Sequence, residues 1–159
     1  MREPRPIRGS PLPLFDRLSE RPSELSGDRN ADRILDAPAL RESVRQDLLR
    51  LLNTRATLRG VILQLAEGTV LDYGLPDLSS LTPASDEDRN LLARSVAARI
   101  SAHEPRLRNV RVVITPHPTS PRSVQGAIMA SLLIGQVYEP VTFHISMELG
   151  GKAPAVSLT

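Results

Sequence analysis

The sequence of 159 residues contains no cysteine and no tryptophan, and only two phenylalanines and two tyrosines. The absence of cysteine excludes disulfides, cysteine nucleophiles and thiolate zinc sites. So few aromatic rings argue against a surface that stacks the bases of single-stranded nucleic acid. Apolar residues still make up 40% of the chain, which is enough for the core of one globular domain with an appendage.

Lysine is also nearly absent, because Lys152 is the only lysine beside nineteen arginines. The 20 basic and 18 acidic residues alternate in sign along the chain, which is typical of a solvated surface rather than a nucleic-acid groove. The longest uncharged run has 16 residues, 123–138, whereas a membrane-spanning helix needs about 20 mostly apolar residues. With no apolar signal segment either, we expect a soluble cytoplasmic protein that neither enters a membrane nor binds nucleic acid.

The polar residues do not form a recognisable catalytic or metal-binding pattern. His103, His117 and His144 are 14 and 27 positions apart, which does not match the ligand spacing of a metal site. The sequence has no G-x-S-x-G nucleophile motif and no glycine-rich phosphate loop followed by a helix. We therefore expect no metal, no cofactor and no nucleophilic catalysis.

A pair of carboxylates is the one enzymatic arrangement that stays open. Glycoside hydrolysis needs two carboxyl groups about 5–10 Å apart in a cleft. The carboxylates of a loop and of two element junctions could meet in this way: Asp72, Asp77, Glu104 and Glu139. A sugar-binding cleft usually also has aromatic platforms, and the four aromatic residues leave little material for them. A peptidoglycan-cleaving glycosidase is therefore only a remote alternative.

The chain divides into a leader, residues 1–35, a domain, residues 36–151, and a tail, residues 152–159. Five of the fourteen prolines lie within the first 22 residues, so the leader cannot form a long helix or a central strand. Leu14, Phe15 and Leu18 form a short apolar cluster with helical spacing inside it. This cluster is either one turn docked on the domain or an anchor that docks on a partner.

Two stretches of the domain have helical periodicity. The first runs from about residue 37 to 53, with Asp36 as N-cap and Pro38 in the first turn. The second opens at Ser85, which has capping-box spacing to Asp88, and ends before Pro105, because proline disfavours a helical residue ahead of it. The buried stripes are Leu40, Val44, Leu48, Leu51 and Leu52 in the first helix, and Leu92, Val96 and Ile100 in the second.

Three strand patterns follow the second helix. Residues 110–115 and 141–149 alternate, residues 124–137 are apolar on both faces, and Pro140 is expected to break the run between the last two. Before them, residues 61–65 could form a short strand, and residues 72–78 a structured loop in which Gly74 takes a positive φ. We expect an α+β fold with two to three helices packed on one face of a three-stranded antiparallel sheet.

Glu104, Pro105 and Arg106 lie where the second helix turns into the first strand of the meander. Because a proline separates the two charged residues, they cannot share one helical face. Each can still make charge-assisted hydrogen bonds, and arginine can do so with a bidentate fork. Two interpretations stay open, namely a local structural clamp and a clamp that also contacts a partner.

Six segments of this chain occur in the same order in one known family. They are Leu14–Leu18, Ser43–Val44 with Asp47–Leu48, Leu51–Arg55, Tyr73–Asp77, Glu104–Leu107 and Glu139–Phe143. In these segments the sequence resembles the TssE baseplate subunits of type VI secretion systems, the family of a baseplate wedge protein of contractile phage tails. It departs from the family at His103, where an aromatic residue is common.

The resemblance implies a structural subunit rather than an enzyme, although the family is sometimes labelled lysozyme-like. Such proteins lie in each wedge of a six-fold baseplate at the cytoplasmic face of the inner membrane and bind the other wedge subunits. Their sheet resembles the strand-exchange domain of the sheath protein, so they offer a template to the first ring of sheath. The interaction candidates are Leu14, Phe15, Leu18, Tyr73, Asp77, Glu104, Pro105, Arg106 and Glu139.

The same fold is also similar to a bacterial anti-adaptor that binds a response regulator. An interaction protein of a different pathway is therefore the alternative to a baseplate subunit. The two segments Leu51–Arg55 and Tyr73–Asp77 together favour the baseplate interpretation.

Overall fold

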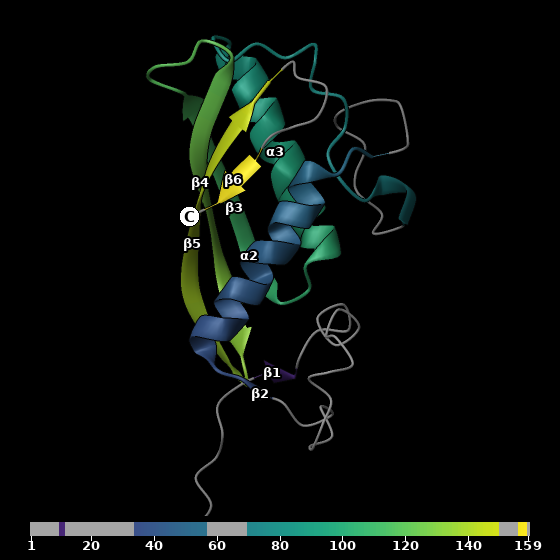
Figure 1. The fold of residues 1–159 in the computed structure, drawn as a ribbon, viewed down its shortest axis with the longest axis vertical. Helices are drawn as coiled ribbons and strands as arrows, with labels where there is room; N and C mark the ends of the chain where they lie inside the picture. The colour runs from purple at the N-terminus through teal and green to yellow at the C-terminus, as the bar shows by residue number, and fades with distance from the viewer. Residues whose placement is uncertain (1–9, 12–33, 57–69, 150–155, 159) are drawn as a thin grey trace, which may run out of the picture.

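A computed structural model describes residues 10–11, 34–56, 70–149 and 156–158. Two helices lie side by side against a four-stranded antiparallel sheet (Figure 1), and two short strands pair in a separate two-stranded sheet. The elements are β1 (Ser10–Pro11), β2 (Ile34–Leu35), α2 (Ala37–Asn53), the 3₁₀-helix η3 (Val70–Asp72), α3 (Asp86–His103), β3 (Leu107–Pro116), β4 (Ser123–Ile134), β5 (Val137–Glu148) and β6 (Val156–Leu158). The apolar cluster Leu14, Phe15 and Leu18 and the possible strand at residues 61–65 lie outside the described residues.

Both helices begin where the sequence predicts. The Asp36 Oδ1 atom accepts a hydrogen bond from the Ala39 N–H at 2.9 Å, and the Ser85 Oγ atom accepts one from the Asp88 N–H at 3.2 Å. The predicted capping box is only half formed, because the Asp88 carboxylate accepts from the Thr82 N–H at 2.9 Å instead of returning to Ser85. Neither α2 nor α3 is long and apolar enough to cross a membrane.

The sheet has the order β3-β4-β5-β6, and every pairing in it is antiparallel. Its three long strands form the expected meander with β4 at the centre, which confirms the α+β prediction. The short β6 adds three residues to the outer side of β5, opposite Ile145, Ser146 and Met147. β4 ends at Ile134 rather than at residue 137, because Gly135 has a φ of 64° and turns the chain into β5.

The prediction that Pro140 breaks the strand is wrong, since Pro140 lies inside β5 opposite Ser131. The Leu149 N–H donates to the Arg122 carbonyl, and bonded pairs alternate along an antiparallel ladder. Counting back from this bond, the residues on either side of Pro140 form hydrogen-bonded pairs with β4, and Pro140 itself does not. Its nitrogen therefore points away from β4. Because β6 begins further along β5, the proline lies at an edge, where its missing N–H removes no ladder bond.

β3 contains a bulge near its start. Arg108 pairs with Ser131 and Arg111 pairs with Met129, so β3 has one more residue than β4 in this interval. Asn109 has a φ of 55°, a left-handed conformation that asparagine tolerates better than most residues. The bulge separates the first two residues of β3 from the regular stretch that begins at Arg111.

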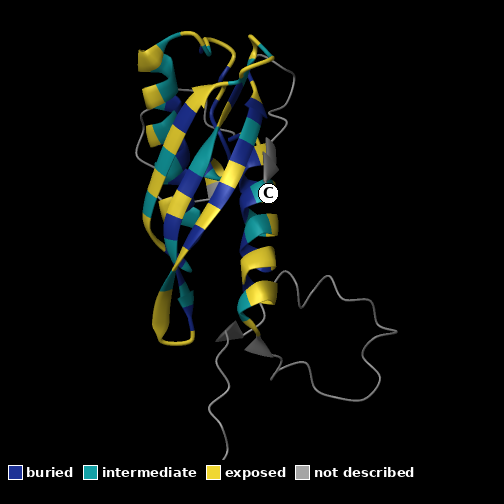
Figure 2. Cartoon of the chain, turned by 90° about the vertical axis from the view of Figure 1, so that its left-hand side faces the viewer, coloured by how far each residue is buried: buried dark blue, intermediate teal, exposed yellow. Residues whose placement is uncertain are grey.

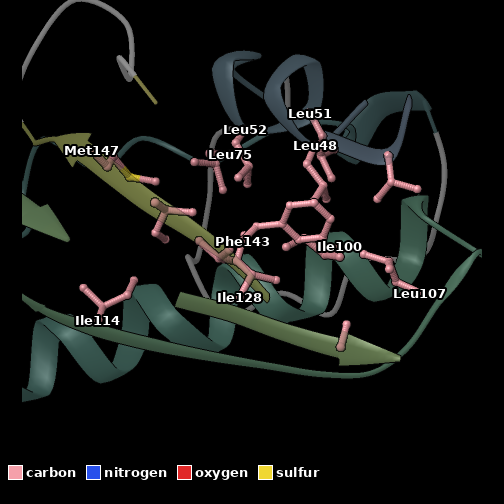
Figure 3. Close-up of a cluster of buried hydrophobic side chains, with 14 of the residues drawn as sticks. Leu48, Leu51, Leu52, Leu75, Ile100, Leu107, Ile114, Ile128, Phe143 and Met147 are labelled. Atoms are coloured by element: carbon pink, nitrogen blue, oxygen red, sulfur yellow. The ribbon is translucent and has the colours of Figure 1, made fainter. Parts of the chain in front are cut away.

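The core lies between the helices and the inner face of the sheet. Buried and exposed positions alternate along the strands (Figure 2). Phe143 reaches from β5 toward Leu48 of α2, with Ile128 of β4 and Ile100 of α3 close by (Figure 3). The predicted stripes of both helices are fully or almost fully buried in this cluster, which explains why the helices cover the sheet.

Candidate functional site

The guanidinium of Arg106 joins the end of α3 to α2. Its Nε donates to Glu104 Oε1 at 2.7 Å and its Nη2 to Glu104 Oε2 at 2.5 Å, so the contact is bidentate. Nη2 also lies 2.6 Å from Asp47 Oδ2, and Nη1 lies 3.2 Å from Ser43 Oγ. Ser43 and Asp47 are four residues apart on α2 and therefore share one face of that helix. We call these four residues the clamp.

The charges of the clamp are enclosed rather than free in solvent. The Glu104 side chain is only 5% exposed, and that of Arg106 is 18% exposed. Burial lowers the pKa of the Arg106 guanidinium, but Glu104 and Asp47 raise it more, so its pKa lies above the ordinary value. Arg50 adds a second cation to Asp47, with 2.7 Å between Nη1 and Oδ1. Positive and negative groups thus alternate through the clamp, which favours the local structural interpretation.

The backbone at the clamp changes from helix to strand within three residues. The Glu104 N–H still donates to Ile100 in α3 at 2.8 Å, whereas the Arg106 carbonyl already accepts from Leu133 in β4 at 3.0 Å. Pro105 lies between them and is exposed. The proline ends the helix, and the two charged residues fix the direction in which β3 leaves it.

A second set of motif residues meets at the end of α2. The Leu75 N–H donates to the Thr54 carbonyl, and the Ala56 N–H donates to the Leu75 carbonyl, each at 2.8 Å. Gly74 has a φ of 103°, and a Cβ there would lie 2.4 Å from the Thr54 oxygen. The loop prediction for residues 72–78 is therefore confirmed, including the positive φ.

Asp77 belongs to this second set of motif residues and lies at the surface. Its Oδ1 lies 2.9 Å from Nη2 of Arg55, and both side chains are more than half exposed. Hydrogen bonds from Ser79, together with the nearby Arg55, hold the pKa of the Asp77 carboxyl below its ordinary value. Such an exposed ion pair adds little to the stability of the fold.

Sequence reasoning missed a buried cluster around His103. The Nε2 atom of His103 lies 3.3 Å from Asp72 Oδ1, within ion-pair distance but outside hydrogen-bond geometry, and both side chains are 9% exposed. The Tyr73 ring packs edge-on against His103, with 5.2 Å between centroids, and Arg99 donates to the Asp72 carbonyl. Burial, and then the charge of Asp47, raise the pKa of the Tyr73 hydroxyl above its ordinary value. The signal in the sequence was the departure from the family resemblance at His103.

Glu139 lies away from the clamp, near the start of β5. Its Oε2 pairs with Arg41 Nη2 at 3.2 Å, and both side chains are exposed. The four carboxylates considered for glycoside hydrolysis thus have four different partners. Glu104 pairs with Arg106, Asp77 with Arg55 and Glu139 with Arg41, and Asp72 lies beside His103. Within the described ranges, no three His, Asp or Glu side chains gather as metal ligands would. Each of the four carboxylates therefore has a different basic side chain beside it.

Residues 38–136, more than half of the chain, match the family model of the baseplate wedge protein gp25. The chain belongs to the gp25 baseplate wedge family. No curated protein and no solved structure matches it. The matched region runs from α2 through the turn between β4 and β5, and it contains the whole clamp and the paired segments Leu51–Arg55 and Tyr73–Asp77. Membership of the gp25 family indicates a structural role in a baseplate, in assembly with other baseplate components.

Proposed function

We propose that this member of the gp25 family is the TssE-type baseplate subunit of a type VI secretion system. It binds the other subunits of each wedge in a six-fold baseplate and templates the contractile sheath. The family match over residues 38–136 is the observation that carries this proposal. Its site of action is the cytoplasmic face of the inner membrane, where the baseplate assembles.

The clamp supports this role by fixing the relative positions of α2, α3 and β3. A scaffold subunit must present its partners with surfaces of constant geometry, and a half-buried network of ion pairs gives orientation as well as stability. Outside the clamp, other groups in or paired with the recognised segments reach solvent, namely Glu139 with its partner Arg41, Arg55 with Asp77, and Pro105. We propose these groups as the wedge-facing contacts.

The sheet supports the second half of the role. Its outer face carries polar side chains, among them Thr142, His144 and Glu148, and exposed apolar ones such as Val113 and Met129, and no helix of the described residues covers it (Figure 2). A sheet with open edges can extend by main-chain pairing with a strand of another chain. The proposed templating of sheath uses this property.

The proposal is tested in the bacterium that carries the gene. Deletion of the gene is expected to abolish fluorescently labelled sheaths, and complementation with the wild-type gene to restore them. Co-purification then tests whether the protein binds the other wedge subunits. Sheaths that assemble at normal frequency in the deletion strain would contradict the proposal.

A further inference from the structure

The outer face of the sheet is turned away from α2 and α3, and no helix of the described residues covers it (Figure 2). The register identifies its side chains. Phe143 and Ile128 are paired and point into the core, so the residues on either side of them along β5 and β4 point outward. The middle of this face is a strip of small or apolar side chains from β4, which we call the β4 strip: Ala127, Met129, Ser131 and Leu133.

The outer face carries more apolar surface than a solvated sheet face needs. Five large apolar side chains are exposed in the described part of the chain, and three of them lie on this face. They are Val113, Met129 and Tyr138, which are 51%, 38% and 52% exposed. An antiparallel sheet that turns one face to water normally carries polar side chains there. This concentration of exposed apolar side chains therefore indicates a contact surface.

Two arginines of β3 border the β4 strip. Arg108 and Arg111 are three residues apart, and such residues point to opposite faces of a regular strand. The bulge that contains Asn109 adds one residue between them. Their partners on β4 are Ser131 and Met129, which both belong to the strip. The bulge thus brings the two arginines to the same face of the sheet.

The charges of the outer face are unbalanced. Arg108 and Arg111 are both exposed, and neither makes an ion pair with another described residue. His144 adds a third basic group on β5. Among the outward-pointing residues of β3, β4 and β5, the one carboxylate is Glu148. It follows Thr142, which lies opposite Met129, by six residues, or about 20 Å at 3.4 Å per residue. The arginines therefore favour an occupant that supplies carboxylates.

A helix is the element that fits this face. β4 is paired with β3 on one side and with β5 on the other, so the face offers side chains and no main-chain edge. The β4 strip is about 20 Å long at 3.4 Å per residue, which is the length of a helix of about 13 residues. Helices cover sheet faces in layered folds. The apolar stripes of α2 and α3 are already buried in the core, so neither of these helices can serve as the cover for a second copy.

We infer that the outer face of the sheet binds an amphipathic helix of another protein, in which acidic residues flank the apolar stripe. The stripe packs along the β4 strip between Val113 and Tyr138, and the acidic residues pair with Arg108 and Arg111. A two-fold contact between copies of this chain is disfavoured, because it would place one basic face against another. The inference goes beyond the proposed function, which uses the edges of the sheet and not its face.

The first test measures the charged part of the contact. It uses the purified full-length chain and a fluorescent peptide of about 14 residues, lactam-bridged to be helical, with leucines at i, i+3 and i+4 spacing and glutamates beside them. Anisotropy is expected to show binding, whereas the same peptide with lysine at every glutamate position does not bind. Arg108→Glu and Arg111→Glu are each expected to weaken binding about tenfold. The matched control is Arg122→Glu, an exposed arginine that precedes β4, and it is expected to leave the affinity unchanged.

The second test measures the apolar part of the contact. Met129→Asp is expected to weaken binding of the acidic peptide at least about tenfold, because it places a carboxylate in the middle of the β4 strip. The matched control is Leu71→Asp, which changes an exposed apolar side chain of η3 and is expected to have no effect. Circular dichroism confirms that each variant keeps the secondary structure of the wild-type chain.

Three results with the peptides would overturn the inference: no binding of the acidic peptide, equal binding of the lysine peptide, or equal losses in the control variants. A basic face also attracts anionic lipid, so flotation with vesicles that contain phosphatidylglycerol is the competing measurement. Binding to these vesicles that is lost in Arg111→Glu, without binding to the acidic peptide, would identify a lipid surface and overturn the inference as well.

The peptide measurements and the deletion of the gene test different statements. If sheaths form without the gene, the proposed function falls, and binding of the acidic helix still supports the inference. If sheaths require the gene but the acidic peptide does not bind, the proposed function stands and the inference falls.

Discussion

Arg106 shows how much of the site a single residue can organise. Sequence reasoning predicted that Glu104 and Arg106 make separate charge-assisted hydrogen bonds to neighbouring groups, whereas the structure joins the two residues to each other by a bidentate contact. It did not predict that Ser43 and Asp47 complete the clamp. The two α2 residues share a helical face, but nothing in their spacing says which segment, some sixty residues later, will face them.

Replacing Arg106 with alanine is expected to lower the free energy of unfolding by about 3–5 kcal/mol, because it leaves the buried Glu104 carboxylate without its partner. Arg106→Lys is expected to give an intermediate loss, since a point charge cannot reproduce the fork. Urea denaturation measures both. The control is Arg50→Ala, which removes a half-exposed pair and is expected to cost less than about 1 kcal/mol.

Equal stability of Arg106→Ala and Arg50→Ala would contradict the clamp. A variant that unfolds supports a local role for Arg106. A variant that stays folded but no longer joins the wedge would instead support the interpretation in which the clamp also contacts a partner.

Gly74 gives a second prediction for a single residue. Gly74→Ala is expected to lower the free energy of unfolding by more than about 2 kcal/mol, because alanine disfavours the positive φ and its Cβ would collide with the Thr54 carbonyl. Gly135→Ala meets only the conformational penalty at a φ of 64° and is expected to cost about 1 kcal/mol. Thermal unfolding of the two variants compares them, and similar losses would argue against the close approach of residues 74 and 54.

At the scale of whole elements, the helices were more predictable than the strands. Apolar periodicity, Asp36, Ser85 and Pro105 define each helix by local signals, so their bounds could be read from neighbouring residues. Strand ends depend on pairing with distant segments. Pro140 looked like a break, and only the ladder of β4 and β5 shows that its nitrogen points to an open edge. The pairing of Leu75 with Thr54 and Ala56 is equally non-local.

The alternation along β3 leads to a test that needs no partner. Val113→Pro is expected to lower the free energy of unfolding by about 3 kcal/mol more than Val112→Pro, because the hydrogen-bonded pairs, counted back from the bond that His117 donates to β4, include Val113 but not Val112. Val112→Ala and Val113→Ala correct for the loss of the side chains, of which Val112 is the more buried. Denaturant titration of the four variants gives the comparison, and equal proline penalties would mean that the β3 edge is not open at Val112.

For the molecule as a whole, the layered architecture followed from the sequence because each helix and strand has one apolar face to bury. The arrangement of the candidate site was less predictable from the sequence. The acidic and basic residues of the recognised segments were identified, but their pairing into separate contacts, and the meeting of Arg108 and Arg111 on one face of the sheet, depend on the three-dimensional arrangement. Leu14, Phe15 and Leu18 stay a prediction, since they lie outside the described residues.

The assembled site also leads us to expect no peptidoglycan hydrolysis. Both oxygens of the Glu104 carboxylate are occupied by Arg106, and the side chain is 5% exposed, so it is not available to protonate a leaving group. The purified protein is expected to release no soluble fragments from peptidoglycan, with a known muramidase as the positive control. Turnover that is lost in a folded Glu104→Gln variant would contradict this expectation.

The contact between Phe143 and the α2 stripe also has a consequence for the protein during its synthesis. Phe143 follows Leu48 by about 95 positions, so α2 leaves the ribosome well before the strand that covers it. At 5–20 residues per second, the leucine stripe of α2 waits roughly 5–20 s for β5. During that interval the nascent chain lacks the strand that covers the leucine stripe of α2 in the folded protein.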